Sequence, residues 1–294
     1  MLSYLQAVIL GLLQGITELF PISSLGHTVI FPALFGWHSV VQAQSAKESF
    51  FLAFLVGMHV ATAIALLIYF RDQWVRIIRG FFVTLRTRRI ETADERLAWL
   101  LIVATIPAGI AGLVFERLFR TVFAKPIAAA GFLVINGLIL FVGDAARRRA
   151  EAHQPVEAPG AARAPARRLD TLDFRESGVI GVAQVFALLA GISRSGITMV
   201  AGLVRGLDYE DAARFSFLLA TPIILAAGLY KLPTDFLGHN GDGVRGQILA
   251  ASLVAGVAAY LTVRFLMRYF ETRKLWPFAI YCVLFGGAMI IYFR

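Results

Sequence analysis

Long apolar segments recur along the whole chain, and they restrict its possible folds more than any other feature. Six charge-poor segments approach the length of a membrane crossing: residues 50–70, 97–115, 126–143, 215–230, 246–263 and 275–293. A bilayer core about 30 Å thick needs roughly 20 apolar residues per helical crossing. With 58% hydrophobic residues, 16% charged residues and a mean hydropathy of +0.72, the chain is predicted to be an all-α integral membrane protein.

The basic residues gather between these segments rather than in a nucleic-acid-binding patch. Residues 71–96 and 144–177 hold seven arginines each, and residues 264–274 hold four basic residues. Such clusters mark cytoplasmic loops, so the net charge of +9 indicates topology and not a nucleic-acid partner. Because the sequence has one cysteine, Cys282, it cannot form an intramolecular disulfide, and we do not expect a metal cluster held by cysteines.

Two further pieces, residues 1–47 and 178–214, must each begin and end on one side of the membrane if the loops alternate. Each is therefore predicted to be a re-entrant hairpin or a pair of spans. Arg194 and Arg205 split the second piece into runs too short for ordinary spans, which favours re-entrance. Residues 153–169, rich in Pro, Ala and Arg, are predicted to form a flexible cytoplasmic linker.

An internal repeat connects these two pieces. "GLLQGITELFPISSLGHT" (11–28) and "GVAQVFALLAGISRSGIT" (181–198) share the pattern G-x2-Q-x7-I-S-x2-G-x-T at a shift of 170 residues. Each half then has one hairpin and three spans, and an odd number of spans inverts the second half. We predict six transmembrane helices plus two re-entrant helical hairpins in one integral-membrane domain, residues 1–294. Its parts are a first repeat (1–146), a cytoplasmic linker (147–176) and a second, inverted repeat (177–294).

The meeting point of the two hairpins carries the polar residues that suggest chemistry. An ionised side chain at membrane depth costs roughly 2.5 to 3.5 kcal/mol even on a lenient scale, so Glu18 and Arg194 are functional candidates. The plainer interpretations are an interface carboxylate for Glu18 and a topology-setting cation for Arg194. For Ser24 and His27 they are a helix cap and an interface histidine.

The residue types favour phosphate chemistry on a substrate delivered from the bilayer. A guanidinium between serines, next to a glycine-opened helix start, suits phosphate oxygens. Glu18 and His27 suit proton transfer, and either Ser24 or a water suits the role of nucleophile. A carboxylate beside phosphates also suits a divalent cation bridged through substrate oxygens.

Two long motifs resemble the undecaprenyl-diphosphate phosphatase family of bacterial inner membranes, the bacitracin-resistance type. They are "QGITELFPISSLGH" (14–27) and "AGISRSGIT" (190–198), and "RFSFLLATP" (214–222) and "WPFAIY" (276–281) add to the match. Gln14 stands where many members have Glu, which makes direct metal binding there doubtful. Ala190 stands where proline is usual, which leaves the loop entry less stiff.

The resemblance implies an enzyme that hydrolyses undecaprenyl diphosphate to undecaprenyl phosphate and inorganic phosphate. This reaction recycles the lipid carrier for peptidoglycan synthesis. The resemblance also implies a pocket facing the periplasm and dependence on Mg²⁺ or Ca²⁺, held by Glu18 with Gln14 as a second candidate ligand. A homodimer is a further expectation. The implied catalytic residues are Glu18, Ser24, His27 and Arg194, and the implied diphosphate-binding residues are Ser23, Ser193, Arg194, Ser195 and Thr198.

Further positions are predicted to shape the pocket, five of them in the repeat and one, His59, outside it: Gln14, Gly26, Gly191, Gly196, Gln184 and His59. A polyprenyl-phosphate transporter or flippase is the alternative function, because inverted repeats with interrupted helices are common in transporters. A carrier needs an anion site but no general acid or base, so Glu18 and His27 favour hydrolysis. A scaffold for cell-wall machinery would leave the intramembrane Glu18 and Arg194 unexplained.

Overall fold

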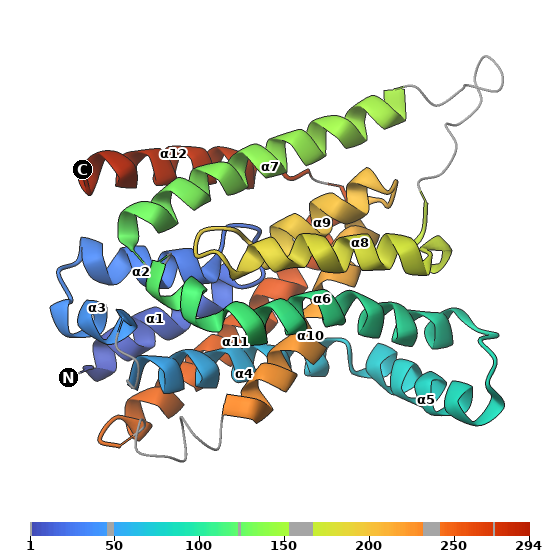
Figure 1. The fold of residues 1–294 in the computed structure, drawn as a ribbon, viewed down its shortest axis with the longest axis horizontal. Helices are drawn as coiled ribbons and strands as arrows, with labels where there is room; N and C mark the ends of the chain where they lie inside the picture. Colours follow the sequence, from blue (N-terminus) through green and yellow to red (C-terminus); the bar gives the residue numbers. More distant parts are fainter. Residues whose placement is uncertain (1, 46–49, 123–124, 153–166, 232–241, 273) are drawn as a thin grey trace.

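The computed structural model describes residues 2–45, 50–122, 125–152, 167–231, 242–272 and 274–294 (Figure 1). These residues form α-helices and two short 3-10 helices, and no β-strand occurs among them. The α-helices are α1 (Tyr4–Thr17), α2 (Ser24–Leu34), α3 (His38–Ser45), α4 (Phe50–Tyr69), α5 (Arg71–Thr87), α6 (Ala93–Val122), α7 (Pro126–Ala152), α8 (Phe174–Val185), α9 (Arg194–Val204), α10 (Tyr209–Lys231), α11 (Arg245–Phe270) and α12 (Trp276–Tyr292). The predicted all-α class is confirmed.

Among the described residues, five helices are long and apolar enough to cross a membrane: α4, α6, α7, α10 and α11. Each covers one of the segments predicted as a span. The sixth predicted span corresponds to α12, an apolar helix of 17 residues that packs along α7 (Figure 1). The outer faces of these helices expose large apolar side chains such as Leu113, Val142, Leu253 and Leu284, as expected of surfaces that contact lipid.

The two pieces predicted as hairpins are each a helix, a loop and a second helix. Residues 18–23 join α1 to α2, and residues 186–193, which include the 3-10 helix η2 (Phe186–Leu188), join α8 to α9. Ser23 Oγ accepts the N–H of Gly26 at 3.2 Å, and Ser193 Oγ accepts the N–H of Gly196 at 3.1 Å. A serine side chain that accepts an N–H of the first turn is a strong helix start. The repeated I-S-x2-G pattern is therefore a capped helix start in both copies.

Each hairpin packs against a long helix from the other half of the chain. A Cβ on Gly11 of α1 would lie 2.4 Å from Ala251 O on α11. A Cβ on Gly181 of α8 would lie 2.5 Å from Ala104 O on α6. These two glycines are equivalent in the sequence repeat, and the missing side chain lets the backbones approach closely in both places. The halves are thus interleaved and not side by side.

Residues 71–96 were predicted to be a loop, and this prediction is wrong for α5. Ile77, Gly80 and Thr84 recur at helical spacing and are buried against α6, where Gly80 contacts Glu95. The arginines of this segment occupy the other faces of the helix. A count of charges therefore does not reveal the helical spacing of the buried residues. The basic segment is therefore an amphipathic helix followed by a short turn.

The predicted linker needs a correction at its end. Residues 153–166 lie outside the described part of the chain. Arg167 is held by Glu176 at 2.7 Å and by Arg205 O at 2.9 Å, and the N–H of buried Leu169 donates to Asp211 Oδ2 at 2.8 Å. Residues 167–169 are thus packed onto α8 and α10, because side chains distant in the sequence satisfy their polar groups.

Candidate active site

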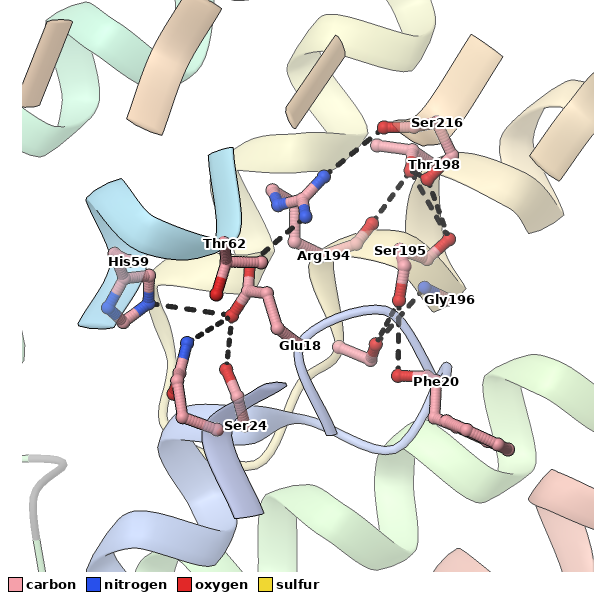
Figure 2. Close-up of polar contacts among 12 residues, drawn as sticks. Glu18, Phe20, Ser24, His59, Thr62, Arg194, Ser195, Gly196, Thr198 and Ser216 are labelled. Carbon is pink, nitrogen blue, oxygen red and sulfur yellow. Dashed lines mark hydrogen bonds and ion pairs between the residues drawn. The ribbon is translucent and has the colours of Figure 1, made fainter. Parts of the chain in front are cut away.

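Glu18 is at the centre of the site, a carboxylate only 7% exposed at the C-terminal end of α1. Its Oε2 accepts hydrogen bonds from Gln14 Nε2 at 3.0 Å and Ser24 Oγ at 2.5 Å. Its Oε1 pairs with Arg194 Nη2 at 3.0 Å, and His59 Nε2 lies 3.5 Å from Oε2 (Figure 2). Both oxygens of this buried carboxylate therefore face donors, as a buried charge requires.

Arg194 brings the opposite charge from the second loop. It is the first residue of α9, and its Nη1 donates to Ser216 O on α10 at 3.2 Å. The ion pair with Glu18 joins residues that are 176 positions apart in the sequence. A guanidinium carries five N–H donors, so donors remain for an anion after these two contacts.

Ser23 connects the loop between α1 and α2 to the loop between α8 and α9. Its φ of 69° lies in the left-handed region, which non-glycine residues rarely adopt. Its Oγ accepts the N–H of Gly191 from the other loop at 3.1 Å, in addition to the N–H that it caps. A Cβ on Gly26 would lie 2.9 Å from Gly191 Cα, so this crossing requires glycine. Ser23 and both glycines therefore set the relative position of Glu18 and Arg194.

Asn136 on α7 bridges the same loops from behind. This residue is fully buried, its Nδ2 donates to Pro21 O at 2.9 Å, and its Oδ1 accepts the N–H of Ser193 at 2.9 Å. Each bond satisfies a backbone group of a loop that has left its helix. Asn136 is therefore a positioning residue for both halves of the site.

A cavity of about 350 Å³ lies beside these groups. Its polar lining consists of Glu18, Ser23, Ser24, His59, Gln184, Ser193 and Arg194. Its remaining walls are apolar and come mainly from α4, η2 and α10, for example Leu55, Leu188 and Ile223. The helices α2 and α9 both begin at the cavity, at Ser24 and Arg194, and helix N-termini favour anions. The cavity thus suits a molecule with an anionic head and an apolar body.

His59 faces the carboxylate from α4. Its Nδ1 lies 2.8 Å from Leu55 O, an acceptor, so Nδ1 carries a hydrogen. The other ring nitrogen, Nε2, lies 3.5 Å from Glu18 Oε2 and attracts it only when it also carries a proton. The pair is therefore arranged to share a proton beside Ser24.

His27, predicted to be the acid or base, lies elsewhere. It is buried outside the cavity lining, with Nδ1 2.7 Å from Ser23 O and Nε2 2.8 Å from Tyr281 Oη. Its ring also lies nearly parallel to the rings of Tyr281 and Phe285, with centroids 5.8 and 5.4 Å away. Both ring nitrogens of His27 therefore have partners outside the cavity, and it is His59, not His27, that lies in the cavity lining beside Glu18.

Ser195 and Thr198, predicted to bind the diphosphate, also lie outside the cavity lining. Ser195 Oγ donates to Phe20 O at 3.2 Å, and Thr198 Oγ1 donates to Arg194 O at 2.7 Å. Both hydroxyls point back into the protein (Figure 2). They hold the start of α9, whereas Ser193 and Arg194 face the cavity.

The predicted pocket-shaping residues differ in their positions. Gln184 and His59 line the cavity, whereas Gln14 is buried beneath Glu18 and donates to it. The Oε1 atoms of Gln14 and Gln184 are buried and have no hydrogen-bond partner among the described residues. A Cβ on Gly196 would lie 3.1 Å from Ser193 Cβ, so this glycine keeps the first turn of α9 compact.

Three supporting residues were not assigned to the site from the sequence: Asn136, Ser216 and Tyr281. Ser216 Oγ lies 2.7 Å from Thr198 Oγ1, and its carbonyl accepts from Arg194. The available signal was an uncharged polar side chain inside an apolar segment, which most often marks an interhelical hydrogen bond. Such a side chain indicates that a hydrogen bond between helices exists, but it does not identify the residue at the other end of that bond.

The described residues do not fit a divalent cation held by the protein. No group of three His, Cys, Asp or Glu residues that could hold a metal ion occurs among them. The one carboxylate in the cavity lining, Glu18, already accepts from Gln14, Ser24 and Arg194. Mg²⁺ and Ca²⁺ prefer several oxygen ligands, which this set does not supply.

Comparisons with known proteins agree on one family. Residues 7–288 match the family described as bacitracin resistance protein BacA. The undecaprenyl-diphosphatase 2 of Frankia alni is 55% identical over 99% of this chain and 98% of its own length. The undecaprenyl-diphosphatase of Mycolicibacterium paratuberculosis is 56% identical, over 99% and 97%. The undecaprenyl-diphosphatase 1 of Burkholderia pseudomallei is 48% identical, over 95% and 93%.

Proposed function

The chain belongs to the bacitracin resistance protein BacA family, and we propose that its cavity is the active site of an undecaprenyl-diphosphatase. The enzyme hydrolyses undecaprenyl diphosphate to undecaprenyl phosphate and inorganic phosphate, which returns the lipid carrier to cell-wall synthesis. One observation carries the site assignment. A carboxylate from one loop and a guanidinium from the other meet at the polar end of an apolar-walled cavity.

In this proposal the diphosphate lies against the two helix starts. Arg194 grips phosphate oxygens with its remaining N–H donors, and the first turns of α2 and α9 add backbone N–H groups. Ser23 and Ser193 line the same wall. The apolar walls contact the first isoprene units of the substrate, which enters from the bilayer.

The Glu18 carboxylate is the general base. It accepts the proton of Ser24 Oγ, or of a water near that oxygen, as the oxygen attacks the terminal phosphorus. The bond from that phosphorus to the bridging oxygen breaks, and undecaprenyl phosphate leaves. If Ser24 attacks, water then hydrolyses the phosphoserine, and if water attacks, phosphate forms in one step. His59 takes the acid/base role predicted for His27, because it faces the same carboxylate oxygen.

A divalent cation, if the reaction uses one, would depend on the phosphate oxygens of the substrate for most of its ligands. This follows from the donor set, because the protein offers one carboxylate that is already paired.

The finer topology belongs to the same proposal: six spans and two re-entrant hairpins in inverted repeats, with the site near the midplane. The equivalent packing of Gly11 on α11 and Gly181 on α6 supports it. In the bacterial inner membrane the arginine-rich α5 would face the cytoplasm and the pocket would open to the periplasm. In a Cys282→Ser background, Ser3→Cys and Arg89→Cys should then react with an impermeant thiol reagent from opposite sides. Labelling from one side only contradicts this topology.

Phosphate release from a C55 or C15 polyprenyl diphosphate by the purified full chain tests the chemistry. We expect Glu18→Gln and Arg194→Lys each to lower kcat by about 10²-fold or more, as loss of a general base or an electrostatic clamp does. His59→Gln should lower activity more than the matched change His27→Gln. Activity that survives the changes at Glu18 and Arg194 refutes the site, and a larger loss at His27 than at His59 refutes the exchange of histidine roles.

The nucleophile is tested separately with substrate labelled in its terminal phosphate. Label retained on the denatured wild-type protein, and absent from Ser24→Ala, identifies a phosphoserine. Full turnover by Ser24→Ala without labelled protein identifies water.

A further inference from the structure

The outer face of α11 is not covered by any helix among the described residues. Leu249, Leu253, Val257, Leu261 and Phe265 recur every four residues along this face, and each is more than half exposed. The opposite face of α11 packs on α1, α4 and α10. Because α11 is long and apolar enough to cross a membrane, its outer stripe is a surface that contacts lipid.

This stripe ends in a groove of about 520 Å³ near the C-terminal end of α11. Its lining consists of Leu261, Arg264, Phe265, Arg268, Tyr269 and Thr272. Arg264 and Arg268 are exposed and stand one helical turn apart on the same face. Among the described residues neither arginine forms an ion pair, and the nearby exposed Glu271 forms none with them. The groove therefore presents two guanidinium groups beside an apolar wall.

The position of the groove indicates what such a pair would contact. The segment that follows α11 is predicted to be cytoplasmic, so the arginines stand where an apolar span meets the cytoplasmic headgroup layer. Anionic lipids of that leaflet attract basic residues, and a guanidinium binds a phosphate through two parallel hydrogen bonds. Leu261 and Phe265 continue the apolar stripe and suit an acyl chain.

We propose that this groove is a binding site for the phosphate headgroup of an anionic phospholipid, with an acyl chain along Leu261 and Phe265. The site lies next to the catalytic loop. Phe265 stacks on Phe20 with ring centroids 6.0 Å apart, and Phe20 is two residues from Glu18. A lipid in the groove thus contacts a ring that packs against the loop carrying the general base.

The experiment counts phospholipids bound to the full chain by native mass spectrometry. Purified protein in detergent is titrated with phosphatidylglycerol or with phosphatidylcholine of the same acyl chains. We expect the tightest site to prefer phosphatidylglycerol, and Arg264→Gln with Arg268→Gln to weaken it about 25-fold, at about fivefold for each arginine. The matched control changes two exposed arginines of α5, Arg71→Gln with Arg79→Gln, and should leave the tightest site unchanged.

The outcomes separate the proposal from its competitors. Equal binding of the two lipids, or undiminished binding of phosphatidylglycerol by the groove variant, overturns it. A wild-type dimer that becomes a monomer in the groove variant shows a protein interface and also overturns it. Arg264→Lys with Arg268→Lys keeps the charges but loses the parallel hydrogen bonds of the guanidinium groups, so its affinity should lie between those of the Gln variant and the wild type. If the Lys variant binds phosphatidylglycerol as tightly as the wild type does, the guanidinium geometry is refuted.

Discussion

Replacement of Asn136 by Ala is the most direct test of how the two loops are held. The change removes a donor to Pro21 O and an acceptor for the N–H of Ser193, both at 2.9 Å in a fully buried position. Each backbone group left without a partner costs about 1 to 3 kcal/mol, so the folded state should lose roughly 2 to 6 kcal/mol.

The same change should reduce activity, although Asn136 is absent from the cavity lining. The loops carry Glu18 and Arg194, and a misplacement of about 1 Å can cost about 10²-fold in rate. Thermal unfolding in detergent measures the first effect, and kcat for phosphate release at saturating substrate measures the second. Leu138→Ala, at an exposed position two residues along α7, is the control and should change neither.

The reasoning is refuted if Asn136→Ala melts within about 1 °C of the Leu138→Ala control and keeps its kcat within twofold. A loss of stability with full activity would show that Asn136 supports the fold but does not position the catalytic groups.

Two other predictions concern backbone strain and pH. Gly191→Ala should sharply reduce the yield of folded protein, because φ is +114° and a Cβ would lie 2.4 Å from Ala129 O; Gly131→Ala, with open space at its Cβ, should not. Equal yields of the two variants in size-exclusion chromatography would contradict this. The hydrogen bond from Arg167 holds the pKa of Glu176 below its ordinary 4.5, so the folded state keeps this carboxylate charged to lower pH than the unfolded chain. Its contribution is complete above the unfolded pKa and is lost as pH falls through the lower folded pKa. Melting temperatures of wild type and Glu176→Gln should therefore differ at pH 7 and converge toward pH 3, and a constant difference would contradict this assignment.

Much of the candidate site could be predicted because its residues are unusual for their surroundings. Glu18 and Arg194 are charges in apolar segments, and Ser23 and Ser193 recur at the same place in a repeat. A buried charge and a repeated helix cap have few structural explanations, so the residue types alone limit the roles that these residues can have. The same reasoning could not show that His27 lies outside the cavity lining, because a histidine beside a motif can face either side of its helix.

The sequence by itself determined the all-helical membrane class, the long apolar helices and the two loops that carry the polar residues. These properties follow from local pattern, because hydropathy and helix caps act over a few neighbouring residues. Only the tertiary structure decided which histidine faces Glu18, which serines face the cavity, and that Asn136 joins the loops. These depend on the rotation of helices and on partners distant in the sequence, as in the contact of His59 with Glu18 and the bond from Ser193 to Asn136. Packing between helices sets that rotation, and a linear pattern does not record it.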